Sequence, residues 1–425
     1  MKVYSIILDK DIVAGGLANI TGEGVICVSP EAEIVNLWTS LITRRLETKV
    51  KTDSDFDAVR DYYYSLSERA DFREKVEQSL EKVDGYLEEA TTFRVFIDSI
   101  VDYVINQCSK LCAELVSEVF GTALVEGPNV IACKEVGGKV TIDWDKTVAQ
   151  AKSRIIGART VISAGYGRNA EGYVVKIGRA GSELTATSIA AILGYESVMF
   201  CTKKNGIQGI PAMTYDEAAH FCSTDDAPFF PAAMWPAMKY GVKIEVVNIL
   251  DPSAACTVIS ADAASQEVSA ITGVVADRGL SLLTVYGSGL LGNVGISSDL
   301  FRVIAEKDVN VRFISQSSSE YSISFAVKDA DTQKATEAIE SLMSEKHLLN
   351  IDDLLILNKK VGIVSVCGDK MRNVPGISGK VFTAIGDAGI SIIAAAQGGE
   401  ELSISIVVDE ADVDSGIAAL SALIG

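Results

Sequence analysis

Residues Val285–Val327 read VYGSGLLGNVGISSDLFRVIAEKDVNVRFISQSSSEYSISFAV, and residues Val366–Val408 read VCGDKMRNVPGISGKVFTAIGDAGISIIAAAQGGEELSISIVV. The two stretches align without a gap at an offset of 81 residues, so that glycine, phenylalanine, glutamine and glutamate recur at matched positions. The tripeptide Ser-Ile-Ser follows in both. An ungapped self-match of this length is typical of a repeated structural unit. The sequence therefore predicts two copies of one module.

The order of patterns within each copy predicts its topology. A strand pattern, a glycine-rich turn and a helical spacing come first, and two alternating strand patterns follow. A second helix, predicted over Ala330–Met343, closes the first copy, and one over Asp412–Ile424 closes the second. This is the pattern of a ferredoxin-like β-α-β-β-α-β module. We predict one module over residues 263–350 and the other over residues 351–425.

Residues 1–262 alternate strand and helix patterns, which is typical of an α/β domain with a largely parallel sheet. The short polar stretch Ser260–Gln266 marks the boundary between this domain and the repeat. The predicted strands are Val3–Leu8, Val25–Val28, Thr160–Ile162, Val174–Ile177, Ser197–Phe200 and Lys243–Val247, and the predicted helices are Ala32–Leu46, Asp55–Ser67, Ala70–Ala90, Asp98–Phe120 and Glu183–Leu193.

The charge balance limits the partners of the chain. It has 38 Lys+Arg against 57 Asp+Glu, a formal net charge of −19. A surface this acidic repels phosphate backbones, so we expect no nucleic acid partner. The apolar residues come in short runs rather than in a stretch of about 20, so we expect no membrane span. The first residues do not read as a signal peptide, and we expect a cytoplasmic protein.

The cysteines and histidines argue against a metal site. The eight cysteines are scattered and form no CxxC pair, and there are only two histidines. Zinc sites need such residues at close spacing, so we expect none. Scattered cysteines in a chain of this length are typical of buried free thiols in a reducing compartment.

One segment, VVKIGRAGSELTATSIAAILG (Val174–Gly194), carries a pattern that points to ligand binding. A strand pattern leads into the turn Gly178–Ser182, and a helix pattern follows. Glycines let the backbone approach a ligand, the first N–H groups of a helix favour an anion, and Arg179 can add a bidentate contact. The alternative is that Ser182 merely caps the helix, with Glu183 near its first turn. The turn by itself leaves both interpretations open.

With the repeat beside it, GRAGSE (Gly178–Glu183) resembles the nucleotide-side turn Gly-Arg-Gly-Gly-Ser-Asp of aspartate kinases, which belong to the amino-acid kinase family. The two modules resemble ACT domains, the amino-acid-sensing unit of that family. The segments ISQSSSEYSISF and AAAQGGEELSIS are most similar to its threonine-sensitive branch. The resemblance covers Thr160–Gly425 and is weak before residue 155.

This resemblance implies an amino-acid-kinase-like (carbamate-kinase-like) α/β domain over residues 1–262, followed by two ACT domains. It also implies where substrate and nucleotide would bind in the first domain. The substrate- or nucleotide-binding residues it suggests are Gly178, Arg179, Gly181, Ser182 and Glu183, and the catalytic candidates are Lys10, Arg179 and Glu183.

This chain departs from the aspartate kinase pattern at the residues that the resemblance implies are catalytic or substrate-binding. Active members carry a lysine in Lys-Phe-Gly-Gly-Thr-Ser, whereas ILDKDIVAGG separates Lys10 from the glycine pair. Their Ser-Phe-Gly-Glu, whose glutamate holds the substrate amino group, has no counterpart in VINQCSKLCAEL (Val104–Leu115). Lys203 replaces an acid of the nucleotide loop, and the lysine of a later motif falls on Ala232. Because phosphoryl transfer depends on positioned positive charge, we expect a degenerate kinase domain.

The ACT part keeps residue types that suit amino-acid recognition. In Leu290–Ser298 a turn leads into a helix N-terminus whose free N–H groups can take a carboxylate. Gln316 and Gln397 stand at matched positions after a strand, and a glutamate at Glu320 can pair with an ammonium group. The alternative is that these polar residues only form hydrogen bonds that stabilise the turns. The effector-binding residues that we predict are Asn293, Ile296, Gln316, Ser319, Glu320 and Gln397.

Two functions are compatible with these patterns. The first is a regulatory or sensor protein of aspartate-family (Thr, Lys, Met) biosynthesis, which binds threonine or a related amino acid and acts on a partner such as an active aspartate kinase. The second is a divergent aspartate kinase that phosphorylates the aspartate side-chain carboxylate with ATP and Mg²⁺, with no other cofactor. Exposed sheet edges of the ACT modules favour a homodimer or higher oligomer in either case. Motif loss beside retained effector residues favours the sensor.

Overall fold

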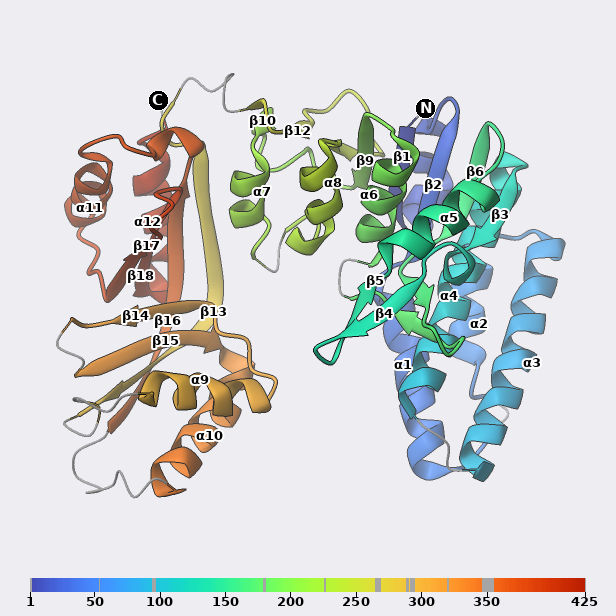
Figure 1. Ribbon diagram of the computed structural model, residues 1–425, viewed down its shortest axis with the longest axis horizontal. Helices are drawn as coiled ribbons and strands as arrows, with labels where there is room; N and C mark the ends of the chain where they lie inside the picture. Colours follow the sequence, from blue (N-terminus) through green and yellow to red (C-terminus); the bar gives the residue numbers. More distant parts are fainter. Residues whose placement is uncertain are drawn as a thin grey trace. The chain divides into compact units, whose positions relative to one another are not determined.

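The computed structural model describes residues 2–52, 54–93, 97–178, 181–224, 227–263, 269–287, 290, 295–318, 321–345 and 355–424. The chain forms two compact units, Met1–Ala263 and Ala264–Gly425 (Figure 1). The division falls inside the stretch Ser260–Gln266 that the sequence marks as a boundary. No helix within the described ranges is long and apolar enough to cross a membrane.

The first unit is built on a sheet whose central strands run parallel. Its described strands follow the order β10-β12-β11-β9-β1-β2-β6-β3, and pairing is parallel from β11 through to β3. The strands are β1 Lys2–Leu8, β2 Gly24–Pro30, β3 Ala123–Glu126, β6 Arg159–Ser163, β9 Ser197–Thr202, β10 Ala212–Met213, β11 Lys243–Asn248 and β12 Thr257–Ile259. The helices are α1 Ala32–Thr48, α2 Asp57–Leu66, α3 Ala70–Phe93, α4 Ile97–Phe120, α5 Trp144–Arg154, α6 Gly181–Leu193, α7 Tyr215–Phe221 and α8 Met234–Tyr240.

Side chains of the central strands divide the apolar core between the two faces of this sheet. On β1, Tyr4, Ile6 and Leu8 share one core with residues of α1 to α4 such as Trp38 and Leu111. Helix α6 also packs against β1 and β2. Because successive side chains of a strand point to opposite faces, α6 covers the face that Tyr4, Ile6 and Leu8 do not use. The sheet is thus buried on both sides, as its apolar strands predict.

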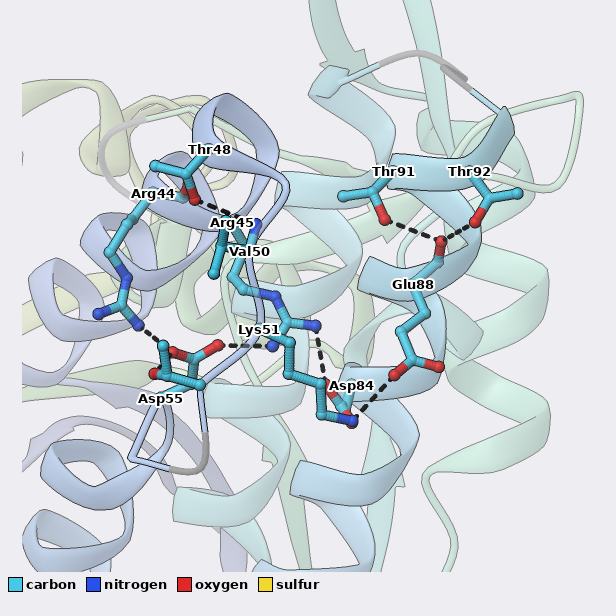
Figure 2. Close-up of polar contacts among 11 residues, drawn as sticks. Arg44, Arg45, Thr48, Val50, Lys51, Asp55, Asp84, Glu88, Thr91 and Thr92 are labelled. Atoms are coloured by element: carbon cyan, nitrogen blue, oxygen red, sulfur yellow. Dashed lines mark hydrogen bonds and ion pairs between the residues drawn. The ribbon is translucent and has the colours of Figure 1, made fainter.

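A network of ion pairs ties the end of α1 to α3 (Figure 2). Asp55, just before α2, accepts hydrogen bonds from Arg44 at 2.5 Å and from Arg45 at 2.6 Å. Thr52 also donates to Asp55. Arg45 continues to Asp84 of α3 at 2.9 Å. The side chains of Arg45 and Asp55 are almost fully buried, so both charges depend on the ion pairs of this network for compensation.

Two hairpins of the first unit differ from the sequence prediction. The predicted strand at Val174–Ile177 forms as β8 (Val174–Lys176), but it pairs with β7 (Tyr166–Arg168) outside the main sheet. A second hairpin joins β4 (Cys133–Val136) to β5 (Lys139–Ile142). The sequence does not predict β4 and β5 because they are short and mostly exposed, so they lack the apolar alternation of a half-buried strand.

The second unit is built on one antiparallel sheet. Its described strands follow the order β14-β15-β13-β16-β18-β17. The strands are β13 Gly273–Tyr286, β14 Phe313–Gln316, β15 Ser322–Lys328, β16 Leu355–Cys367, β17 Ala394–Gln397 and β18 Ser403–Asp409. The helices are α9 Ile296–Glu306, α10 Thr332–Glu345, α11 Ile377–Asp387 and α12 Val413–Ser421.

The repeat predicted from the sequence is present element by element. Helix α9 and strands β14 and β15 recur 81 residues later as α11, β17 and β18. The match extends to side chains. The hydroxyls of Thr284 and Ser324 share a hydrogen bond of 2.9 Å, and those of the matched pair Ser365 and Ser405 share one of 2.8 Å.

The two modules exchange part of their central strand, which the predicted linear boundaries do not describe. Strands β13 and β16 pair along their length, with a register shift at Arg278 and Gly279. After the shift, β13 pairs with β15 of the first module. Before it, Val274 and the preceding Ile271 belong to the apolar core of the second module. The start of β13 therefore completes the second module, because one long strand serves two cores that no single cut can separate.

The cysteines are free thiols, and seven of the eight are buried. Cys256 is exposed, so the prediction of buried thiols fails at this one position. It lies just before β12, a three-residue strand.

Candidate functional site

The carboxyl ends of the parallel strands meet at one edge of the main sheet, where charged residues gather. Strand β1 is followed by Asp9, Lys10 and Asp11, and its neighbour β9 is followed by Lys203. The chain continues from β1 to β2 on one side, while β9 lies on the other side, so the strand order reverses here. Ligands of open α/β sheets bind in the crevice at such a point. We therefore take this edge as the candidate site of the first unit.

Lys203 is held between two carboxylates at this edge. Its Nζ lies 2.5 Å from Oδ2 of Asp9 and 2.6 Å from Oδ2 of Asp11. Asp9 is buried, and its Oδ1 accepts a hydrogen bond of 2.9 Å from the backbone N–H of Ile12. Hydrogen bonds to Asp11 and Asp9 raise the pKa of Lys203 above its ordinary value. The two carboxylates neutralise Lys203 within the chain, so Lys10 is the remaining cation among the four charged residues of this cluster.

Asp9 and Asp11 are site residues that sequence reasoning missed. Both stand directly after the predicted strand Val3–Leu8, and Lys203 follows the predicted strand Ser197–Phe200. Charged residues at the ends of two adjacent parallel strands were the available signal. The family resemblance points to Lys10 at this edge and not to its two acidic neighbours.

Lys10, one of the three catalytic candidates, is an exposed member of this cluster. The glycine pair that follows it is wound into a π-helical turn, Ile12–Gly16, and a 3₁₀ turn continues over Leu17–Asn19. A Cβ at Gly16 would come within 3.3 Å of Ile249. The second glycine of the pair therefore serves close packing against the residue after β11, not an open loop that cradles phosphate.

The predicted glycine turn leads into α6, and Ser182 does not take the capping role of the alternative interpretation. Helix α6 begins at Gly181, so Ser182 lies within the first turn and does not cap the helix. The Ser182 hydroxyl donates a hydrogen bond of 2.8 Å to Oε2 of Glu183. A Cβ at Gly181 would come within 2.6 Å of Cα of Gly165, just after β6. The helix therefore starts at the same edge of the sheet, as the anion-site interpretation requires.

Glu183 is buried in that first turn. Burial raises the pKa of its carboxyl above the ordinary value, and the Ser182 hydrogen bond opposes this only in part. A carboxyl that resists ionisation is a poor ligand for a cation. Gly178 has φ +97° and is exposed, whereas Arg179 lies outside the described residues. Across the described ranges, no group of three or more His, Cys, Asp or Glu side chains could hold a metal ion.

The predicted effector residues lie in the second unit. Gln316 and Gln397 are the last residues of β14 and β17, and both are exposed. Oε1 of Gln397 accepts a hydrogen bond of 3.1 Å from Ser378 in the first turn of α11. Within the described residues, Gln316 makes no such bond to Ser297, the residue matched to Ser378. The two copies therefore differ at this position.

The remaining effector candidates divide into two groups. Ile296 begins α9 and packs against the apolar core of the first module, so its side chain serves packing. Asn293, Ser319 and Glu320 lie outside the described residues. Both repeat helices follow a left-handed glycine, Gly295 at φ +92° and Gly376 at φ +89°. This conformation favours glycine because it carries no Cβ.

Comparison with known families and sequences agrees with this architecture. The amino acid kinase family matches residues 41–248, and the ACT domain family matches residues 283–342 and 364–423. The bifunctional aspartokinase/homoserine dehydrogenase of Haemophilus influenzae is 30% identical over 59% of this chain and 32% of its own length. The aspartokinase of Bacillus sp. (strain MGA3) is 25% identical over 62% of this chain and 65% of its own length. The matched part thus spans about a third of the bifunctional relatives.

Two solved structures share the fold along the whole chain. Aspartate kinase of Clostridium acetobutylicum superposes with a TM-score of 0.79 at 18% identity, covering 100% of this chain and 99% of that one. Aspartokinase III of E. coli, solved in complex with lysine and aspartate, gives a TM-score of 0.77 at 19% identity with the same coverage. The chain therefore contains an amino acid kinase family domain followed by two ACT domains, and the proteins that it resembles are aspartokinases.

Proposed function

We propose that this chain is an amino-acid-binding regulatory protein of aspartate-family biosynthesis whose kinase-like unit no longer transfers phosphate. One observation carries the proposal. At the carboxyl edge of the sheet, Lys203 is neutralised between Asp9 and Asp11 at 2.5 and 2.6 Å. Phosphoryl transfer needs positioned positive charge that is free to meet the phosphates. Here Lys203 is already committed to an internal ion pair, and the exposed Lys10 makes no hydrogen bond or ion pair among the described residues that would position it.

The acid at the start of α6 supports the same proposal. In the resembled turn an aspartate stands where this chain has Glu183. Glu183 is buried and bonded to the Ser182 hydroxyl, and burial raises its pKa. A residue in this state is poorly suited to hold Mg²⁺ or to orient a charged substrate. The neutralised Lys203 and the buried Glu183 lie at the same edge of the sheet, and both argue against an active phosphotransferase.

The ACT unit supplies the binding part of the proposal. An amino acid carries a carboxylate, for which the first turns of α9 and α11 offer free N–H groups. It also carries polar groups that the Gln316 and Gln397 amides can contact. Because the Gln397 oxygen is already bonded to Ser378, we place the principal ligand beside Gln316. Threonine is the proposed effector, on the resemblance of this segment to the threonine-sensitive branch.

Assembly is part of the proposal. Strands β14 and β17 stand at the two edges of the ACT sheet. Ile314 of β14 is 49% exposed, and an exposed edge strand with an apolar residue favours pairing with another chain. We propose a homodimer or higher oligomer through these modules, in the cytoplasm, with an active aspartokinase as a further partner.

Calorimetric titration of the full chain with threonine, lysine and methionine tests this function. We expect threonine to bind with release or uptake of heat and to raise the melting temperature. Gln316→Ala should weaken threonine binding by about tenfold, the usual effect of losing a hydrogen bond to a charged or polar ligand. If none of the three amino acids binds, or if Gln316→Ala binds threonine as the unmodified chain does, this site is wrong.

An active, divergent aspartate kinase is the second candidate. The start of α6 at the carboxyl edge favours it, because a helix N-terminus there can hold a phosphate. ATP and Mg²⁺ would then be required. Formation of ADP from ATP and aspartate distinguishes this candidate from the first.

A further inference from the structure

A cleft of about 640 Å³ opens in the first unit, apart from the carboxyl-edge cluster of Asp9 and Lys203. Its walls come from α3, α4, the end of β3 and the β7–β8 hairpin. A volume of this order accommodates a drug-sized organic molecule, because known ligand pockets measure roughly 300–1,000 Å³. The side chains that give the cleft its chemistry are Lys82, Tyr86, Tyr103, Asn106, Arg168 and Tyr173.

Two cations of this cleft have no carboxylate partner among the described residues. The guanidinium of Arg168 bonds to neutral oxygens only, at 2.7 Å to the Gly172 carbonyl and at 3.4 Å to Oδ1 of Asn129. Lys82 lies 5.8 Å from the centre of the Tyr103 ring. Lys110, by contrast, is paired with Glu126 at 2.9 Å. The cleft is lined by three cations and by the two carboxylates of Glu89 and Glu126, so its wall is net positive in a chain of net charge −19, which favours an anionic ligand.

Three tyrosines provide flat apolar surface in the same cleft. The rings of Tyr86 and Tyr103 pack with their centres 4.4 Å apart. Tyr173, on the β7–β8 hairpin, is 60% exposed, and Tyr86 is 40% exposed. Large aromatic side chains at the mouth of a cleft are well suited to stack on a planar ring. The shape and surface therefore favour a ligand that carries an aromatic group.

Asn106 adds a buried polar group to the wall of the cleft. It lies on α4, is 2% exposed, and its Oδ1 has no hydrogen-bond partner among the described residues. A buried acceptor without a donor costs free energy, so a ligand N–H or O–H that satisfies this amide gains affinity. Asn106 belongs to Val104–Leu115, where the resemblance expects a glutamate that holds an amino group. The part of this stretch that lines the cleft is Asn106, Gln107 and Lys110, so it offers amides and a cation rather than a carboxylate.

We infer that this cleft binds an aromatic carboxylate that also carries an N–H or O–H donor. Arg168 and Lys82 would meet the carboxylate, because guanidinium and ammonium groups form strong charge-assisted hydrogen bonds with it. The tyrosines would flank the ring, and the amide of Asn106 would take the donor. The ligand class differs from the amino acid proposed for the ACT modules, so this inference does not rest on the proposed function.

Calorimetric titration of the full chain with indole-3-carboxylate tests the inference, because this probe combines a flat ring, an N–H group and a carboxylate. We expect saturable binding that added threonine does not displace. Indole-3-carboxamide, which lacks the charge, should bind at least about tenfold more weakly, and so should cyclohexanecarboxylate, which lacks the aromatic ring. Absence of heat up to roughly 10 mM probe, or equal binding of the carboxamide, would overturn the inference.

Variants locate the bound probe. Arg168→Gln should weaken indole-3-carboxylate by about tenfold or more, since it removes a charged hydrogen bond at the cleft. Arg154→Gln, an exposed arginine of α5 that does not line the cleft, is the matched control and should bind as the unmodified chain does. Tyr86→Ala should also weaken binding. Because the Tyr86 side chain is 40% exposed, this variant should still fold. Equal affinity of Arg168→Gln and Arg154→Gln would contradict the placement, as would loss of binding in Arg154→Gln.

Discussion

Nζ of Lys203 lies 2.5 Å from the carboxylate of Asp9, across the carboxyl ends of β9 and β1. Asp9 is buried and also bonded to the backbone of Ile12, so its position is fixed from two sides. The pair occupies the point of the sheet at which α/β proteins bind ligands. At this edge the buried carboxylate of Asp9 is therefore neutralised by a lysine of the same chain.

Lys203→Met should lower the free energy of unfolding by about 1–3 kcal/mol, because Asp9 is left buried without its counter-charge. Lys10→Met, at the exposed lysine two residues before Ile12, should change it by less than about 0.5 kcal/mol. Urea denaturation at neutral pH measures both. A larger loss of unfolding free energy in Lys10→Met than in Lys203→Met would contradict the role given to the Asp9–Lys203 pair.

Glu183 predicts a pH dependence of stability. Burial raises its pKa above the ordinary value of 4.5, so the folded state binds a proton more tightly than the unfolded state does. Stability is therefore lost as the pH rises above 4.5 toward the folded pKa. Glu183→Gln removes this loss. The melting temperature of this variant should therefore exceed that of the unmodified chain, and the difference should be larger at pH 8 than at pH 4.5. A pH-independent difference between the two proteins would argue against a buried, titrating Glu183.

The ion network of Figure 2 predicts the opposite pH behaviour. Burial alone would raise the pKa of Asp55, but hydrogen bonds from Thr52 and Arg45 outweigh it and lower the pKa to about 2. Its stabilisation is present above the ordinary value of 3.8 and is lost as the pH falls toward 2. Asp55→Asn should cost about 3 kcal/mol at pH 7, because the buried Arg45 loses one of its two carboxylate partners and keeps only Asp84.

Lys51→Ala is the matched control for this network. Lys51 pairs with Asp84 at 2.5 Å and with Glu88 at 2.8 Å, but its side chain is half exposed. Exposed pairs contribute at most about 1 kcal/mol. Chemical denaturation at pH 7 and pH 3 should therefore separate Asp55→Asn from Lys51→Ala, and equal losses at pH 7 would contradict the buried network.

The two ACT copies should respond unequally to mutation. Gln397 is bonded to Ser378, whereas Gln316 has no matched bond within the described residues. Gln316→Ala should therefore remove more of the threonine-induced rise in melting temperature than Gln397→Ala does. Thermal denaturation of both variants with and without threonine measures this. A larger loss in Gln397→Ala would place the principal ligand in the second copy instead.

The repeat and its helices could be predicted from the sequence because local periodicity and the 81-residue self-match depend on neighbouring residues only. The exchange of the first half of β13 could not. Val274 and Leu283 stand in one apolar strand, yet they belong to the cores of different modules on the two sides of the register shift at Arg278 and Gly279. Which core each half of a long strand completes is decided by partners far away in the chain.

In the candidate site, too, features formed by contiguous residues could be predicted and contacts between distant residues could not. The glycine turn before α6 could be found because its residues are contiguous. The Asp9–Lys203 pair joins residues on two strands that are adjacent only in the folded sheet. The role of Ser182 was also out of reach, because a hydroxyl bonded to a neighbouring carboxylate and a helix cap have the same local sequence.

A coupled assay for ADP tests most directly the proposal that the kinase-like unit does not transfer phosphate. Purified chain is mixed with ATP, Mg²⁺ and aspartate, and ADP is followed through a coupled reaction. The account predicts no ADP above the level without protein, with or without threonine. Aspartate-dependent ADP formation at ordinary kinase rates of about 1–100 per second would contradict it.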